Sequence, residues 1–197
     1  MTMALQAQYV EPEILTFEDY MSEGEINRRY DIIDGKREYM TNPSLLHQDV
    51  AFNITEALRR FQRKLRLGRT IMAPADILIT RKPLRTRQPD ALFISKERFG
   101  TRNLSDPAPL SPAPELVVEV LSPSESRATR AAKIRDYCKV GVLECWIVSP
   151  QAETVEVLRL THVAHETVDI YGHDATVTSI TFPDLAIPVA DIFAYDE

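Results

Sequence analysis

The feature that most constrains this chain is a short apolar segment with a carboxylate inside it. The segment reads Ala113-Pro114-Glu115-Leu116-Val117-Val118-Glu119-Val120-Leu121-Ser122-Pro123. An apolar run of this length between prolines predicts a β-strand that is covered on both faces. Side chains alternate along a strand, so Glu119 shares a face with Val117 and Leu121. An ionised carboxylate there is costly unless a cation or several hydrogen-bond donors meet it.

A second carboxylate, Asp90, stands at the start of another apolar run, residues 91–94. If the two strands are neighbours, Asp90 and Glu119 converge at one point, which is how proteins hold a divalent metal ion. Each acid also has a simpler interpretation. Asp90 could cap a strand after Pro89, and Glu119 could face water on an edge strand.

The order of the predicted elements indicates an α/β fold with a mixed β-sheet flanked by helices. An N-terminal hairpin is predicted over residues 29–40 around an Asp34-Gly35 turn. Further predicted elements are a helix capped by Thr16, a helix from Ser44 to Leu67 closed by Gly68, strands at about 70–80, 90–95 and 114–121, a helix around 131–138, a strand at 143–148, and a C-terminal β-meander over 154–182. The 197 residues suit one domain, 1–197, with its core at about 28–160 and an acidic extension at 151–197.

The charge of the chain is uneven. The net charge is −6, but residues 151–197 hold nine acids and one base, while residues 58–87 hold ten Lys or Arg and one acid. A local basic surplus of this size can contact phosphates, and a solvated helix face followed by a charged loop is the alternative. The candidate DNA contacts in this region are Arg59, Arg63, Arg85 and Arg87.

The sequence offers no sign of a membrane segment or of an oxidising compartment. No apolar stretch approaches the roughly 20 residues that span a bilayer. Residues 1–7 lack the basic and apolar regions of a signal peptide. Cys138 and Cys145 are expected to be reduced packing residues. We therefore expect a cytoplasmic protein.

Many metal-dependent nucleases carry an Asp and then Glu-x-Lys, with the lysine on the face of the glutamate. Here the lysine position is Leu121, but Lys133 stands in the helix that directly follows the strand. A long amine on a helix packed beside the strand end can place its charge near the same metal.

With these residues in place, the chain resembles the PD-(D/E)xK restriction-endonuclease-like superfamily and, within it, the Uma-type family of small endonucleases. The matching residues follow the family order over about 28–160. They are Tyr30-Asp31-Ile32-Ile33-Asp34-Gly35, residues 43–48, Asp76, Gln88-Pro89-Asp90, residues 115–124, Lys133, Tyr137, Gly141-Val142 and Trp146.

The resemblance implies a restriction-endonuclease-like core and a set of site residues. Asp90 and Glu119 would hold Mg²⁺, with Mn²⁺ as a possible substitute, helped by the backbone carbonyl of Val120. Lys133 would be the displaced catalytic lysine. His47, as a catalytic residue, and Asp76, as a further ligand, would line the cleft. DNA would be the substrate, and similar proteins make a homodimer the expected assembly.

The chain also departs from the family pattern. Asp31 and Thr129 stand where Glu and Asp are usual, and Cys145 replaces an aromatic residue. Loss of an acid at position 129 could loosen the placement of Lys133. Taken singly, Lys133 is more often a solvated helix charge, and a histidine such as His47 is more often a capping or core residue.

The function predicted from the sequence is therefore a Mg²⁺-dependent endonuclease that hydrolyses DNA phosphodiester bonds. A catalytically silent DNA-binding or protein-interaction module on the same fold is the alternative, and the acidic extension favours it modestly. A hydrolase of small phosphate esters has less support, because no Gly-rich phosphate loop or His-rich metal motif is present. The deciding observation is whether Asp90, Glu119 and Lys133 converge.

Overall fold

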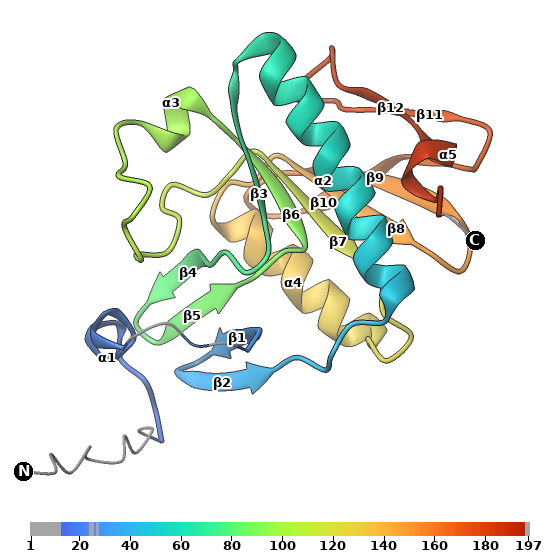
Figure 1. The fold of residues 1–197 in the computed structure, drawn as a ribbon. Helices are drawn as coiled ribbons and strands as arrows, with labels where there is room; N and C mark the ends of the chain where they lie inside the picture. Colours follow the sequence, from blue (N-terminus) through green and yellow to red (C-terminus); the bar gives the residue numbers. More distant parts are fainter. Residues whose placement is uncertain (1–12, 24–25, 27, 196–197) are drawn as a thin grey trace, which may run out of the picture.

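The structure, a computed structural model, describes residues 13–23, 26 and 28–195. The expectation about a signal peptide concerns residues 1–7 and lies outside the described residues. The largest element is a six-stranded sheet in the order β10-β9-β8-β7-β6-β3 (Figure 1). Its strands are β3 (Gly68–Met72), β6 (Ala91–Ser95), β7 (Leu116–Val120), β8 (Glu144–Ser149), β9 (Thr154–Leu160) and β10 (His165–Tyr171).

Strand β7 lies between β6 and β8, so the sheet covers it on both edges. Its pairing with β8 is parallel and its pairing with β6 is antiparallel, which makes the sheet mixed, as predicted. The chain passes from β7 to β8 through helix α4 (Arg127–Lys139). Since β7 is an inner strand, the edge-strand interpretation of Glu119 is wrong.

Two helices cover opposite faces of this sheet. Helix α2 (Leu45–Leu65) packs on the face that carries Leu116, Val118 and Val120. Helix α4 packs on the face that carries Val117, and Cys138 and Cys145 are buried there as free thiols. The predicted alternation of β7 between two apolar environments is therefore confirmed.

A second sheet, in the order β2-β1-β5-β4, stands beside the first. It contains β1 (Tyr30–Ile33), β2 (Lys36–Tyr39), β4 (Ile77–Arg81) and β5 (Leu84–Arg87), and the short helix α1 (Phe17–Ser22) precedes it. The hairpin β1–β2 is the one predicted. The single strand predicted over 70–80 is wrong: residues 68–72 and 77–81 belong to different sheets, with Pro74, which cannot donate to a ladder, between them.

Of the helix ends predicted from capping residues, two starts are correct and one end is wrong. Thr16 caps α1 in a capping box with Asp19, as expected from its sequence position. Helix α2 begins after Ser44 but does not end at Gly68; Arg66 is its left-handed C-cap, with φ 54°. Gly68 instead opens β3, where an added Cβ would lie 2.2 Å from the carbonyl oxygen of Ile94.

The C-terminal segment is part of the fold and not only a meander. Strands β9 and β10 extend the main sheet, while β11 (Thr176–Thr178), β12 (Ala186–Pro188) and α5 (Val189–Ile192) pack onto the α2 side of the core. The buried carboxylate of Glu144 accepts bonds from Trp146 Nε1 (2.6 Å), Ser179 Oγ (2.7 Å) and the Thr181 amide (2.9 Å). These bonds tie the segment to β8.

Candidate functional site

Asp90 and Glu119 come together where β6 begins and β7 ends. The Asp90 amide donates to the carbonyl of Val118 (3.0 Å), and Asp90 Oδ2 accepts from the amide of Val120 (2.8 Å). Asp90 is thus bonded to the residues on both sides of Glu119. Both carboxylates are almost fully buried, at 5% and 4% exposed. The predicted convergence of the two acids is present.

Two cationic or protonatable groups face Asp90. Arg29 Nη1 donates to Asp90 Oδ1 (2.8 Å), and Arg29 Nη2 donates to the carbonyl of Gln88 (3.0 Å). Burial pushes the pKa of Asp90 up, but hydrogen bonding to His47 and the charge of Arg29 outweigh it, so this pKa is lowered. Asp90 is therefore ionised at neutral pH.

His47 lies in the first turn of α2, where Ser44 Oγ accepts from its amide. Its Nε2 is 3.0 Å from the carbonyl oxygen of Val120 and 3.4 Å from Asp90 Oδ2. Burial lowers the pKa of His47, but the contact with Asp90 outweighs that effect and the pKa is raised. His47 thus sits against two of the oxygens that the family resemblance assigns to the metal.

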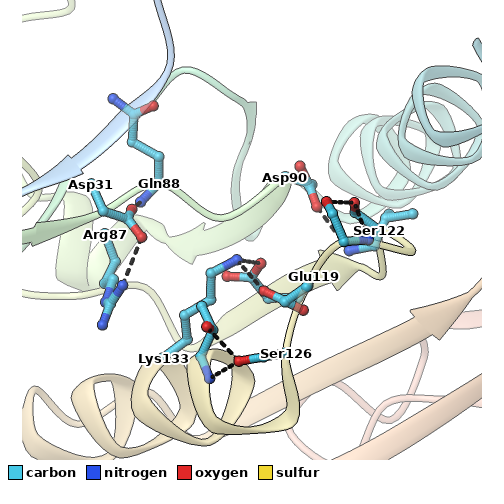
Figure 2. A network of polar contacts seen from close by, with 12 residues as sticks. Asp31, Arg87, Gln88, Asp90, Glu119, Ser122, Ser126 and Lys133 are labelled. Atoms are coloured by element: carbon cyan, nitrogen blue, oxygen red, sulfur yellow. Dashed lines mark hydrogen bonds and ion pairs between the residues drawn. The ribbon is translucent and has the colours of Figure 1, made fainter. Parts of the chain in front are cut away.

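Lys133 reaches Glu119 from helix α4 (Figure 2). Its Nζ lies 2.7 Å from Glu119 Oε2 and 2.9 Å from Glu125 Oε1, and Tyr137 Oη donates to the other oxygen of Glu119. Burial alone would lower the pKa of Lys133, but the charges of Glu119 and Glu125 raise it. The lysine is therefore an ammonium ion at neutral pH, suited to electrostatic work and not to proton abstraction.

The pKa of Glu119 is set by its burial and by two neighbouring charges. Burial raises its pKa, the charge of Lys133 opposes that, and the charge of Asp90 raises the pKa further. The net direction is upward. Two adjacent buried carboxylates favour a cation between them for the same physical reason.

Thr129 stands where similar sequences carry an acid, and another carboxylate holds Lys133 in this chain. Thr129 only continues the cap of α4, where its amide donates to Ser126 Oγ (3.0 Å). Glu125 supplies the second carboxylate to Lys133 instead. The sequence did not predict the roles of Arg29, Glu125 and Tyr137. Arg29 and Glu125 stand in irregular segments without periodicity, and the pattern around Tyr137 is that of a buried core residue.

An open cleft of about 270 Å³ gives access to this cluster. Its wall includes Arg29, His47, Asp90, Val120 and Lys133. Glu119 lies beneath the cleft, behind the amine of Lys133. A ligand in the cleft would meet Asp90 and the lysine directly.

Arg87 and Arg85 are not available to DNA, which corrects that prediction. Arg87 is 3% exposed and its guanidinium bonds Asp31 Oδ2 (2.7 Å) and Asp136 Oδ2 (2.9 Å). Arg85 bonds Asp136 (3.0 Å) and Asp34 (2.8 Å). These pairs join the second sheet to α4, and Figure 2 shows Arg87 pointing toward Asp31. Arg59 and Arg63, in contrast, are exposed on α2.

Asp76 is also placed away from the pair. It accepts bonds from Tyr20 Oη (2.8 Å) and Gln88 Nε2 (3.4 Å), and it lines a different hollow, together with Leu104 and Pro107. Burial raises its pKa. The prediction that Asp76 lines the same cleft as a metal ligand is therefore wrong. Its bond to Gln88 instead holds the segment that precedes Asp90.

Among the described residues, no group of three or more His, Cys, Asp or Glu side chains has a ready metal-holding arrangement. The same residues include no helix that is both long and apolar enough to cross a membrane. A metal ion at the acid pair would therefore need further donors, such as the carbonyl of Val120 or water.

The mixed sheet, its two covering helices and the buried acid pair with its lysine define a restriction-endonuclease-like α/β protein. The chain belongs to the Uma2 family, described as "Putative restriction endonuclease", whose model matches residues 14–190. A crystal structure of a putative nuclease belonging to DUF820 from Anabaena variabilis shares the fold, with a TM-score of 0.73 and 21% sequence identity. The match covers 91% of this chain and 97% of that one. No curated protein matches the chain.

Proposed function

We propose that this protein is a Mg²⁺-dependent endonuclease that hydrolyses phosphodiester bonds of DNA, with Mn²⁺ as a substitute. The observation that carries the proposal is the contact of the Lys133 ammonium with Glu119, directly beside Asp90 and under an open cleft. Membership of the restriction endonuclease family supports the same reaction class.

The residues present fit a hard divalent ion in their donor chemistry. Asp90, Glu119 and the carbonyl of Val120 offer oxygen atoms only, which Mg²⁺ prefers. Both acids are buried and adjacent, and a divalent ion between them would offset the repulsion by which Asp90 raises the pKa of Glu119. These three residues would hold the ion, and a bound Mg²⁺ would supply a water of lowered pKa and would neutralise charge on the phosphate.

The side chains of the chain itself would do the remaining work. Lys133, kept protonated by Glu119 and Glu125, would orient the attacking water and stabilise the negative charge that develops on the phosphate. A donor placed in this way is typically worth about 3 kcal/mol in the transition state. Arg29, on the cleft wall, would contact a phosphate oxygen, and His47 would hold the Val120 carbonyl and Asp90 in place.

Arg59 and Arg63 would contact the phosphate backbone, because both are exposed on α2. The homodimer implied by the family resemblance is part of the proposal as well, and sedimentation of the purified protein measures it.

Nicking of supercoiled plasmid with Mg²⁺ or Mn²⁺ tests the proposal. The wild type and the Asp184→Ala control, which removes an exposed carboxylate elsewhere, should nick equally. Asp90→Ala should not nick. Equal nicking by Asp90→Ala and the wild type would contradict the assignment of Asp90 to the active site.

One observation favours the silent-module alternative. Arg29 meets Asp90 and Lys133 meets Glu119, so protein cations already face both acids. Calorimetric titration with Mn²⁺ separates the two functions. A nuclease site should bind Mn²⁺ and lose affinity in Glu119→Gln, whereas a silent module should show no binding at this pair.

A further inference from the structure

Helix α2 and strand β3 lie side by side in the fold (Figure 1). Strand β3 is the edge strand of the six-stranded sheet and packs against α2. The cleft with His47 and Asp90 lies at the N-terminal end of α2. A second hollow, of about 760 Å³, lies at its C-terminal end.

This second hollow is strongly basic, and we call it the cationic groove. Its lining holds no acid. Four of its side chains define it: Arg63, Arg66, Arg69 and Lys96. Arg69 is braced by the ring of Phe99, with its guanidinium carbon 4.9 Å from the ring centroid. The groove is thus built from α2, β3 and the short helix α3 (Lys96–Phe99).

The four cations that define the groove carry charge that no ion pair in the described residues neutralises. Within the part of the chain that the structure describes, none of the four cations forms an ion pair with a carboxylate, whereas Arg29, Arg87 and Lys133 all do. Arg102, at the rim of the groove, differs because its Nε lies 3.9 Å from Asp106 Oδ2 and its Nη1 donates to the carbonyl of Pro109 (2.9 Å). Uncompensated positive charge in a chain of net charge −6 indicates a polyanionic partner.

The groove and the cleft lie along the same helix, α2. Between them lies a hollow of about 670 Å³, whose wall includes Phe52 of α2 and Met72 of β3. That hollow shares Arg29, His47 and Asp90 with the cleft. The cleft is therefore extended along α2, and a rod-like ligand that enters it would point along this helix toward the groove.

We propose that the cationic groove binds the phosphate backbone of a DNA duplex arm that extends beyond the cut site. This inference rests on the proposed function, because the cleft defines where the cut occurs. His47 and Arg63 are 16 positions apart on α2, which corresponds to about 24 Å of helix at ~1.5 Å per residue. At ~3.4 Å per base pair, the groove meets the arm roughly seven base pairs from the scissile phosphate.

The test is DNA binding without divalent metal, so that it does not depend on cleavage. The full-length protein is titrated onto a fluorescent duplex of about 24 base pairs in EDTA, between ~50 and ~200 mM salt. The test variant is Arg63→Gln with Lys96→Gln. The matched control, Lys36→Gln with Arg135→Gln, removes two exposed charges outside the groove, and all four side chains are exposed, so folding is preserved.

Neutralising two phosphate contacts should lower the slope of log affinity against log salt by about 1.8 in the test variant. The control should keep the wild-type slope. The inference is overturned if the test variant binds as the wild type does, or if the control loses as much as the test variant. If binding depends on the groove but no metal-dependent cleavage occurs, the proposed function is contradicted and the inference about the groove still holds. Metal-dependent cleavage together with unchanged binding in the test variant would support the proposed function and overturn the inference about the groove.

Discussion

The ammonium of Lys133 lies 2.7 Å from Glu119 Oε2, although the two residues are 14 positions apart and belong to different elements. Leu121, two residues after Glu119, occupies the position where a lysine is common in metal-dependent nucleases. The charge that is absent from the strand is thus restored from helix α4, and Glu125 holds it from the other side.

Removing this charge should separate catalysis from metal binding. Lys133→Met should lower the rate of plasmid nicking by about 10²–10³-fold, because one preorganised cation is lost from the transition state. Mn²⁺ binding by calorimetry should persist, since both carboxylates remain. Arg135→Met, on the exposed face of the same helix, is the control and should change neither. Wild-type nicking by Lys133→Met would show that the lysine is structural.

The Arg85–Asp136–Arg87 cluster should make stability depend on pH. Burial would raise the pKa of Asp136, but hydrogen bonds and charge from Arg87 and Arg85 lower it. Its contribution to the free energy of unfolding is therefore present above the unfolded-state pKa and is lost as pH falls through the folded-state pKa. Asp136→Asn should cost about 3 kcal/mol at neutral pH. In urea denaturation, the difference from wild type should shrink on acidification.

A matched exposed variant, Asp184→Asn, should show no such difference at either pH. A gap between Asp136→Asn and wild type that stays constant into acid would contradict the assigned ion pairs.

Glu144 should anchor the C-terminal segment. Glu144→Gln replaces one accepting oxygen with an amide NH₂, which cannot accept. At Oε2 this removes the bonds from Ser179 Oγ and the Thr181 amide, and at Oε1 it removes those from Trp146 Nε1 and the Ile180 amide. The loss of a buried acceptor should destabilise the fold by about 1–3 kcal/mol, measured by thermal unfolding. Glu97→Gln, at an exposed carboxylate on α3, is the control. Equal melting of both variants would show that the bonds to Glu144 carry little stability.

The close approach at Gly68 gives a purely steric prediction. Gly68→Ala should push β3 away from Ile94 and cost about 1–3 kcal/mol, as overpacking does, because the new Cβ meets a backbone oxygen at 2.2 Å. Gly172→Ala meets no atom within 4 Å and should be neutral by the same denaturation assay. A neutral Gly68→Ala would mean that the strand has room to shift.

Parts of this structure follow from local patterns in the sequence. The alternation of residues 116–121 predicted the two covered faces of β7, because a strand buried on both sides needs apolar residues at every position but the functional one. The Asp34-Gly35 turn and the Thr16 cap were predicted for similar reasons. Each depends on chemistry within a few residues.

Other parts depend on contacts that no local pattern contains. Arg87 reads as a free basic residue until its partner Asp31, 56 positions away, is known. Asp76 lies beside an apolar strand, but residues 73–76 carry the chain from one sheet to another, and this takes the acid out of the cleft. Lys133 was identified from its place on the helix that directly follows the strand, and the family resemblance gave it its catalytic role, but helical periodicity does not give its distance from Glu119.

The most direct test of the central claim is plasmid nicking by wild type and Glu119→Gln across a Mg²⁺ titration. Glutamine keeps the shape of the side chain and one accepting oxygen but removes the charge that a metal needs. The account predicts nicking by the wild type only when metal is present, and a loss of at least about 10²-fold in Glu119→Gln. Equal rates for the two proteins, or nicking by the wild type in EDTA, would contradict it.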